Sequence, residues 1–154
     1  MNESYLIVFG ALLAIVGGYI GDEIRSWRER SRERDSIKIS LRDEISDIKS
    51  TIDKMHEVWT QASVLSSGYI SSLISNTEAY DNLRIRLFLI KEEDVRKEIV
   101  GFYKELRDTC KKSRGKIGSL GDSTEIRTEQ TNIHSDFQSL GTKAHTLIGK
   151  LKGE

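Results

Sequence analysis

The sequence of 154 residues contains no proline and a single cysteine, and it has equal numbers of basic and acidic side chains, 24 of each. One cysteine excludes an internal disulfide bond and a zinc site made of several cysteines. The absence of proline favours long helices, because a proline inside a helix costs about 3 kcal/mol. The zero net charge argues against nucleic acid as a partner, because nucleic-acid-binding domains normally carry a basic excess.

Charged residues are also missing from residues 5–21, which read YLIVFGALLAIVGGYIG. As a helix this segment measures about 25 Å, slightly less than the hydrocarbon core of a bilayer, which is about 30 Å thick. We therefore expect a short tail at 1–4 and a transmembrane helix at 5–21, with the lipid bilayer as a partner. Two alternatives stay open, a cleaved signal peptide and a buried helix of a soluble protein. The first lacks a basic residue before the apolar run, and the second needs protein on every side.

Basic residues follow this span and none precedes it; the five arginines within 22–36 are Arg25, Arg28, Arg30, Arg32 and Arg34. Basic residues concentrate on the cytoplasmic side of membrane proteins, whereas acidic residues have little influence. The sequence therefore predicts a single-pass protein of the cell (inner) membrane, with its N-terminus outside and its bulk in the cytoplasm. Residues 22–36 are expected to form a basic juxtamembrane helix close to anionic lipid headgroups.

Small residues recur every four positions within the span, at Gly10, Ala14 and Gly18. This spacing lets two membrane helices approach closely, so these three residues are candidates for transmembrane packing. The alternative is that glycine is simply common in membrane helices and that the stripe has no function.

Apolar residues recur every three or four positions in three segments of the remaining part, 37–154. This spacing is typical of helices that bury one face in a bundle. The three apolar stripes are Ile37, Leu41, Ile45, Ile48, Ile52, Met55, Trp59 and Ala62; Val95, Ile99, Phe102, Leu106, Thr109, Ser113 and Ile117; and Ile126, Ile133, Phe137, Leu140, Ala144, Leu147 and Leu151. We expect an all-α fold. In it the transmembrane helix continues into a long cytoplasmic helix, and 37–154 form an antiparallel, coiled-coil-like bundle of three to four helices.

Two segments connect these helices. Residues 116–122 contain two glycines and are short enough to form an antiparallel helical hairpin. Residues 66–90 are serine-rich at first, and Ser75 with Glu78 resembles a capping box, which predicts a short helix over 76–83. The apolar residues 86–90 are expected to pack on the end of the bundle.

Part of this connecting segment and the helix after it resemble a family of small uncharacterised prokaryotic proteins. These proteins have one membrane anchor, a basic juxtamembrane helix and a helical cytoplasmic domain. The resemblance rests on Thr77, Tyr80, Asp81, Leu83, Leu87, Leu89, Ile90, Phe102, Tyr103 and Leu106, with Asn76 where the pattern usually has proline. It is specific over about 76–106 and covers roughly 5–110 in architecture. It implies the same layout and supplies no reaction, because the family has no settled activity.

Motifs that carry catalysis are missing from the sequence, including phosphate-binding glycine loops, H-E-x-x-H and G-x-S-x-G. The three histidines, His56, His134 and His145, are expected at the surface, since the last two are about 16 Å apart along one helix, too far for one metal. Cys110 lies next to an apolar stripe and is expected to be a packed thiol. We therefore expect neither an enzyme nor a cofactor or metal site.

The most informative polar pair is Tyr80 and Asp81, because both belong to the segment that carries the resemblance. They are candidates for contact with a partner protein or a small ligand; the alternative is that Tyr80 plugs the end of the bundle while Asp81 bonds locally. The sequence favours a membrane-anchored interaction or scaffold protein that binds an unidentified protein or a second copy of itself. A ligand-responsive module at the inner membrane face is the alternative, with a cavity lined by Tyr69, Tyr80, Phe88 and Phe102.

Overall fold

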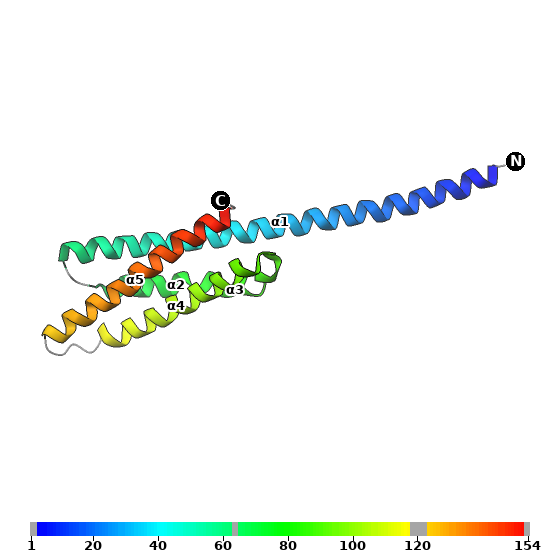
Figure 1. Ribbon diagram of the computed structural model, residues 1–154. Helices are drawn as coiled ribbons and strands as arrows, with labels where there is room; N and C mark the ends of the chain where they lie inside the picture. Colours follow the sequence, from blue (N-terminus) through cyan, green and yellow to red (C-terminus); the bar gives the residue numbers. More distant parts are fainter. Residues whose placement is uncertain (1–2, 63–64, 118–122, 153–154) are drawn as a thin grey trace. The chain divides into compact units, whose positions relative to one another are not determined.

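The computed structural model describes residues 3–62, 65–117 and 123–152. Within these ranges the side chains at 3–9, 11, 12, 62, 78, 79, 117 and 123–127 are not described. All regular elements of the described residues are helices (Figure 1), which confirms the predicted all-α class. Its elements are α1 Glu3–Ala62, α2 Ser67–Asn76, α3 Glu78–Arg84, the short 3₁₀ helix η1 Leu87–Leu89, α4 Glu93–Ile117 and α5 Ser123–Lys152.

The chain divides into two compact units, Met1–Ser36 and Ile37–Glu154. The first unit is the N-terminal part of α1. In the second unit, the rest of α1 packs with α2, α4 and α5 as a helical bundle around one apolar core. The bundle confirms the predicted packing of 37–154.

The three predicted stripes supply most of this core. On α1 every stripe residue from Ile37 to Met55 is buried, and Trp59 is half-buried against the core. Buried stripe residues on the other two helices are Ile99, Phe102, Leu106, Thr109 and Ser113 of α4, and Ile133, Phe137, Leu140, Ala144, Leu147 and Leu151 of α5. The predicted stripe positions 62, 117 and 126 lie outside the described side chains.

The helices α4 and α5 run antiparallel, as the ion pairs between them demonstrate. Lys150 pairs with Glu98 at 2.5 Å, Lys143 with Glu105 at 2.6 Å, and Lys112 with Asp136 at 3.3 Å. Each step of seven residues up α4 is matched by a step of seven down α5, which is the heptad repeat of an antiparallel coiled coil. The predicted hairpin is therefore correct in direction, although its connection at 118–122 lies outside the described residues.

The segment 66–90 contains more helix than the sequence predicts. The unexpected helix α2 buries Ile70 and Leu73, and the Ser66 hydroxyl accepts a hydrogen bond from the Gly68 N–H at 3.3 Å at its start. Ser75 lies inside α2, so the proposed capping box is wrong. The predicted short helix is shifted to α3, which follows α2 after the single residue Thr77.

Among the described residues, no helical stretch combines the length and the apolarity needed to cross a bilayer. The predicted span, 5–21, includes positions 5–9, 11 and 12, whose side chains lie outside the description.

Candidate functional site

Two tyrosines stack where α1, α3 and α4 meet. The ring centroids of Tyr80 and Tyr103 are 3.8 Å apart and their planes differ by 8°. The Arg107 guanidinium carbon lies 5.7 Å from the centre of the Tyr80 ring. Tyr80 is only 3% exposed and Tyr103 is fully buried. Because these rings occupy the core, Tyr80 presents no ring face to a partner at the surface.

Arg107 ties this aromatic pair to the predicted candidate Asp81. Its guanidinium makes an ion pair with the Asp81 carboxylate at 2.6 Å and donates a hydrogen bond to the Thr77 carbonyl at 3.2 Å. Such a double contact holds α3 against α4. Of the two residues that the sequence singles out, only Asp81 is therefore at the surface, and one of its oxygens is engaged within the chain.

Glu44 of α1 lies close to the Tyr103 hydroxyl and to the backbone of Tyr80. Both of its carboxylate oxygens and the Tyr103 hydroxyl are shielded from solvent without a hydrogen bond of regular geometry. Burial raises the pKa of Glu44, and the interactions with the Tyr103 hydroxyl and the Tyr80 backbone lower it in part. Burial, and then the charge of Glu44, raises the pKa of Tyr103. A shielded carboxyl with a perturbed pKa beside a groove is a candidate functional group, although structural pairs show the same signature.

A groove of about 530 Å³ lies on the solvent side of Glu44. We call it the acidic groove, because Glu44 and Asp47 are the charged side chains among its described lining residues, and amides or hydroxyls make up most of the rest. Its remaining lining residues are Ser40, Ser75, Asn76, Asn82 and Leu83. The groove thus joins α1 to the 66–90 segment. Tyr69, Tyr80, Phe88 and Phe102, which the sequence proposes as a cavity lining, do not line this groove.

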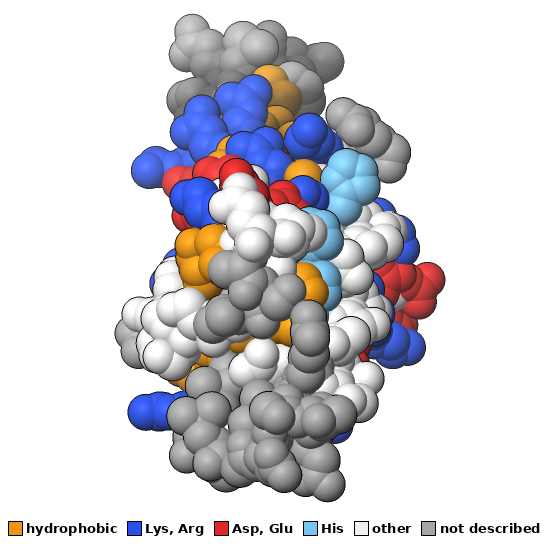
Figure 2. Space-filling view, turned by 90° about the vertical axis from the view of Figure 1, so that its left-hand side faces the viewer, with side chains coloured by type: hydrophobic (Ala, Val, Ile, Leu, Met, Phe, Trp, Pro, Cys, Tyr) orange, Lys and Arg blue, Asp and Glu red, His pale blue; other side chains and the backbone are white. Residues whose placement is uncertain are grey.

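A second polar contact joins α1 to α5 and was not predicted. His56 Nδ1 and His134 Nε2 are 2.8 Å apart, and the Trp59 ring lies nearly parallel to the His134 ring at a centroid distance of 5.0 Å. Figure 2 shows histidine side chains (pale blue) gathered on one side of the bundle. His134 is only 8% exposed, so the expectation of a surface histidine is wrong there. Burial lowers the pKa of His134, and the facing His56 lowers it further.

The contact between these histidines accommodates a proton rather than a metal ion. Two nitrogens bound to one tetrahedral zinc ion lie roughly 3.3 Å apart, because each bond is about 2.0–2.1 Å. At 2.8 Å the pair instead forms a hydrogen bond in which one neutral ring donates and the other accepts. In the described part of the chain no three His, Cys, Asp or Glu side chains are grouped to hold a metal. His145 is exposed on α5 and does not join the pair.

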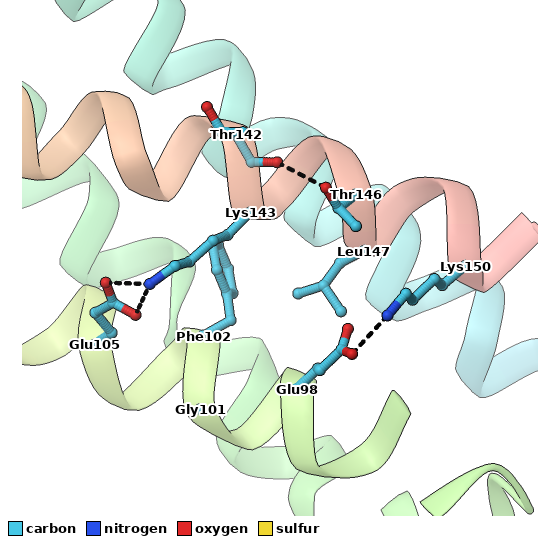
Figure 3. A pocket seen from close by; sticks show the side chains of 9 residues that line it. All are labelled: Glu98, Gly101, Phe102, Glu105, Thr142, Lys143, Thr146, Leu147 and Lys150. Atoms are coloured by element: carbon cyan, nitrogen blue, oxygen red, sulfur yellow. Dashed lines mark hydrogen bonds and ion pairs between the residues drawn. The ribbon is translucent and has the colours of Figure 1, made fainter. Parts of the chain in front are cut away.

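A further groove, of about 430 Å³, runs between α4 and α5 (Figure 3). Phe102 and Leu147 form its apolar floor, beside Gly101, and the pairs Lys143–Glu105 and Lys150–Glu98 cross it from one helix to the other. Since these four charged groups bind one another, the groove offers an apolar floor between satisfied ion pairs.

Cys110 of α4 is buried, and burial raises the pKa of its thiol to about 12. This agrees with the expectation of a packed thiol.

Comparisons of the chain with protein family models, with curated proteins and with solved structures give no match. The resemblance over 76–106 therefore stays a prediction, and the function has to be inferred from the chain itself.

Proposed function

We propose that this chain is a membrane-anchored helical interaction protein, held in the inner membrane by a single N-terminal span, with its bundle in the cytoplasm. The observation that carries the proposal is the exposure of large apolar side chains on α1 between residues 13 and 27. Their exposed fractions run from 46% to 74%. They are Leu13, Ile15, Val16, Tyr19, Ile20, Ile24 and Trp27. A contiguous apolar surface of this kind is rare on a soluble monomer and is typical of a membrane or protein contact.

The opposite side of this helix is made of small residues. At about 100° per residue, Gly10, Ala14, Gly17, Gly18 and Gly21 fall within an arc of about 100°, facing away from the large side chains. A methyl group at any of these glycines would meet no other described atom within 4 Å. Each glycine costs the helix about 1 kcal/mol relative to alanine. Because the described chain gives no packing reason for them, the small face favours close approach of another membrane helix, including that of a second copy.

The proposed orientation rests on Arg25, Arg28, Arg30, Arg32 and Arg34, which follow the span. The bundle would then meet its protein partner in the cytoplasm. No catalytic role is proposed: the surface cations of the groove in Figure 3 are engaged in ion pairs, and His56 and His134 bind each other.

Membrane extraction tests the anchor directly. The full chain with a C-terminal fluorescent tag should sediment with membranes after an alkaline carbonate wash, and protease added to intact cells should leave the tag uncut. Leu13→Arg combined with Val16→Arg should release the chain, because an arginine near the centre of a span costs about 3 kcal/mol. The control variant, Ile39→Arg with Val100→Arg, adds the same charge at exposed apolar positions of the bundle. It should leave the chain in the membrane. Release of the unchanged chain by carbonate would overturn the proposal.

A ligand-responsive role is the second candidate, and the acidic groove favours it. The groove is formed by α1 and by 66–90, so a bound ligand would touch both the long helix and the connecting segment. Its exposed carboxylate, Asp47, and its two amides would suit a small cationic or polar compound. A thermal-shift series with diamines and simple amines should stabilise the full chain and leave Asp47→Asn unaffected. Equal shifts in both proteins, or none, would remove this candidate.

A further inference from the structure

The eight residues 84–91, between α3 and α4, form a corner of the bundle that we call the basic corner. They read RIRLFLIK, with three cations and no acidic residue. Backbone hydrogen bonds fix its turns: the Arg86 N–H donates to the Leu83 carbonyl at 2.9 Å, and the Ile90 N–H donates to the Leu87 carbonyl at 3.0 Å. The corner is therefore a defined part of the bundle surface.

The apolar residues of the basic corner point in two directions. Leu87 and Ile90 are buried in the core, whereas Ile85 is 80% exposed and Phe88 is 67% exposed. The inner pair thus anchors the corner, and the outer pair projects two large apolar side chains from fixed turns. Arg84, Arg86 and Lys91, which flank them, are also exposed.

The basic corner lies at the end of the bundle where α1 enters it. Lys38, beside the first bundle residue of α1, makes an ion pair at 3.0 Å with Glu92, the residue that follows the corner. Figure 1 shows α3 at this same end of the bundle. The proposed span ends at residue 21, so only 22–36 separate it from the part of α1 beside the corner.

We propose that the basic corner docks on the anionic surface of the membrane that holds the anchor, with Ile85 and Phe88 in the interface and Arg84 and Lys91 facing lipid phosphates. This inference rests on the proposed membrane anchor. Cationic groups around exposed aromatic and aliphatic side chains are the composition of elements that lie at membrane interfaces. The span already holds the corner close to lipid, so even a weak contact is populated through its high effective concentration.

A second copy of the chain fits the same surface less well. A stable protein interface buries about 800 Å² on each partner, far more than two projecting side chains provide. Three exposed cations within eight residues would also repel their counterparts in a symmetric contact. An anionic lipid surface requires no matching protein area and attracts these cations, and the acidic residues Glu92 and Glu93 that follow them are paired with Lys38 and Lys97.

Docking sets one geometric requirement on the chain. As a helix, 22–36 measure roughly 23 Å, and they belong to the continuous helix α1, so the corner reaches the headgroups only if α1 as a whole is tilted from the membrane normal. The five arginines within 22–36 favour such a position, because each gains free energy near an anionic surface.

The test places a fluorescent label on the basic corner of the full chain in lipid vesicles. Phe88→Cys, or Ile85→Cys as a second site, is labelled with an environment-sensitive nitrobenzoxadiazole; the buried Cys110 does not react. The control label is at Thr60→Cys, exposed near the other end of the α1 bundle segment. In vesicles of phosphatidylcholine with phosphatidylglycerol, the corner label should shift to the blue and be quenched by doxyl lipid, and the control label should do neither.

The shift should be lost in phosphatidylcholine alone and weakened by salt. Arg84→Gln with Lys91→Gln should reduce docking about fivefold for each charge removed near an anionic surface. Lys54→Gln with Lys111→Gln, which removes the same charge elsewhere on the bundle, should leave it unchanged. Equal signals at positions 88 and 60 would overturn docking, and a blue shift that doxyl lipid does not quench would indicate a protein contact instead. If the chain does not enter vesicles at all, the anchor itself is wrong, and this inference falls with it.

Discussion

The histidine contact between α1 and α5 should make the stability of the bundle depend on pH. At neutral pH one ring donates and the other accepts across 2.8 Å. When both rings are protonated, two donors and two positive charges face each other. With the ring centroids 4.9 Å apart, the repulsion is about 3 kcal/mol at an effective dielectric constant of about 20. The folded chain therefore takes up the second proton only at lower pH than the unfolded chain does.

The sign of the effect follows from the lowered pKa of His134. The stabilisation is complete above the ordinary histidine pKa of about 6.5 and is lost as the pH falls below it. One proton bound only by the unfolded chain costs about 1.4 kcal/mol of stability for each pH unit. Between pH 6.5 and pH 5 the loss is thus at most about 2 kcal/mol, which is below the limit set by the repulsion.

Urea unfolding of the full chain in a nonionic detergent, followed by circular dichroism at pH 7 and pH 5, measures this loss. His56→Gln should reduce the pH-dependent part, because His134 then faces no second imidazole and only its burial still lowers its pKa. His145→Gln, at an exposed position of the same helix α5, should leave the pH dependence as it is. A His56→Gln chain that loses as much stability on acidification as the unchanged chain would refute the reasoning. The Asp and Glu side chains contribute equally in all three proteins and cancel in the comparison.

Three further predictions concern single positions of the bundle. Gly101→Ala should raise the free energy of unfolding by about 1 kcal/mol, because a methyl group there meets open space; Gly141→Ala should gain less, because its methyl group would lie 3.3 Å from Ile52. Urea midpoints of both variants measure the difference. Tyr103→Phe should cost more stability at pH 7 than at pH 4, because loss of the hydroxyl raises the pKa of Glu44 further and the charged carboxylate is then less well solvated; the same titration at two pH values decides it. Cys110, with a pKa of about 12, should not react with iodoacetamide at pH 8 until the bundle is unfolded, as mass spectrometry would record.

The apolar periodicity was sufficient to predict the bundle but not its polar contacts. Burial selects a three- and four-residue spacing, so stripe residues such as Leu41 and Leu140 can be identified from one sequence. Helix α2 was missed because its serines hide a short apolar face, Ile70 and Leu73. The contact of His56 with a histidine 78 residues away depends on the register between two helices, and periodicity alone does not specify that register.

The burial of Tyr103 is a second feature that the apolar periodicity does not predict. It follows the stripe residue Phe102 and would lie beside a narrow two-position stripe, yet it is fully buried. The α4 face that packs in the bundle is therefore wider than a coiled-coil stripe, as expected for a helix with neighbours on more than one side. This wider face brings the Tyr103 hydroxyl against Glu44. A polar contact between helices can thus arise at a position that a pairwise heptad pattern assigns to the surface.

Exposed apolar side chains are the observation that connects the two proposals. In the described chain they concentrate on α1 between residues 13 and 27 and again at Ile85 and Phe88. Both places are accompanied by arginines, within 22–36 and at 84 and 86. An anionic bilayer stabilises apolar groups that lie beside cations. The apolar groups leave water there, and the headgroups solvate the charge of the cations. Ile39 and Val100 are exposed as single large apolar side chains on the bundle and belong to neither of these two groups. If a protein partner binds the bundle, these two positions are where substitution by arginine should weaken it without affecting membrane attachment.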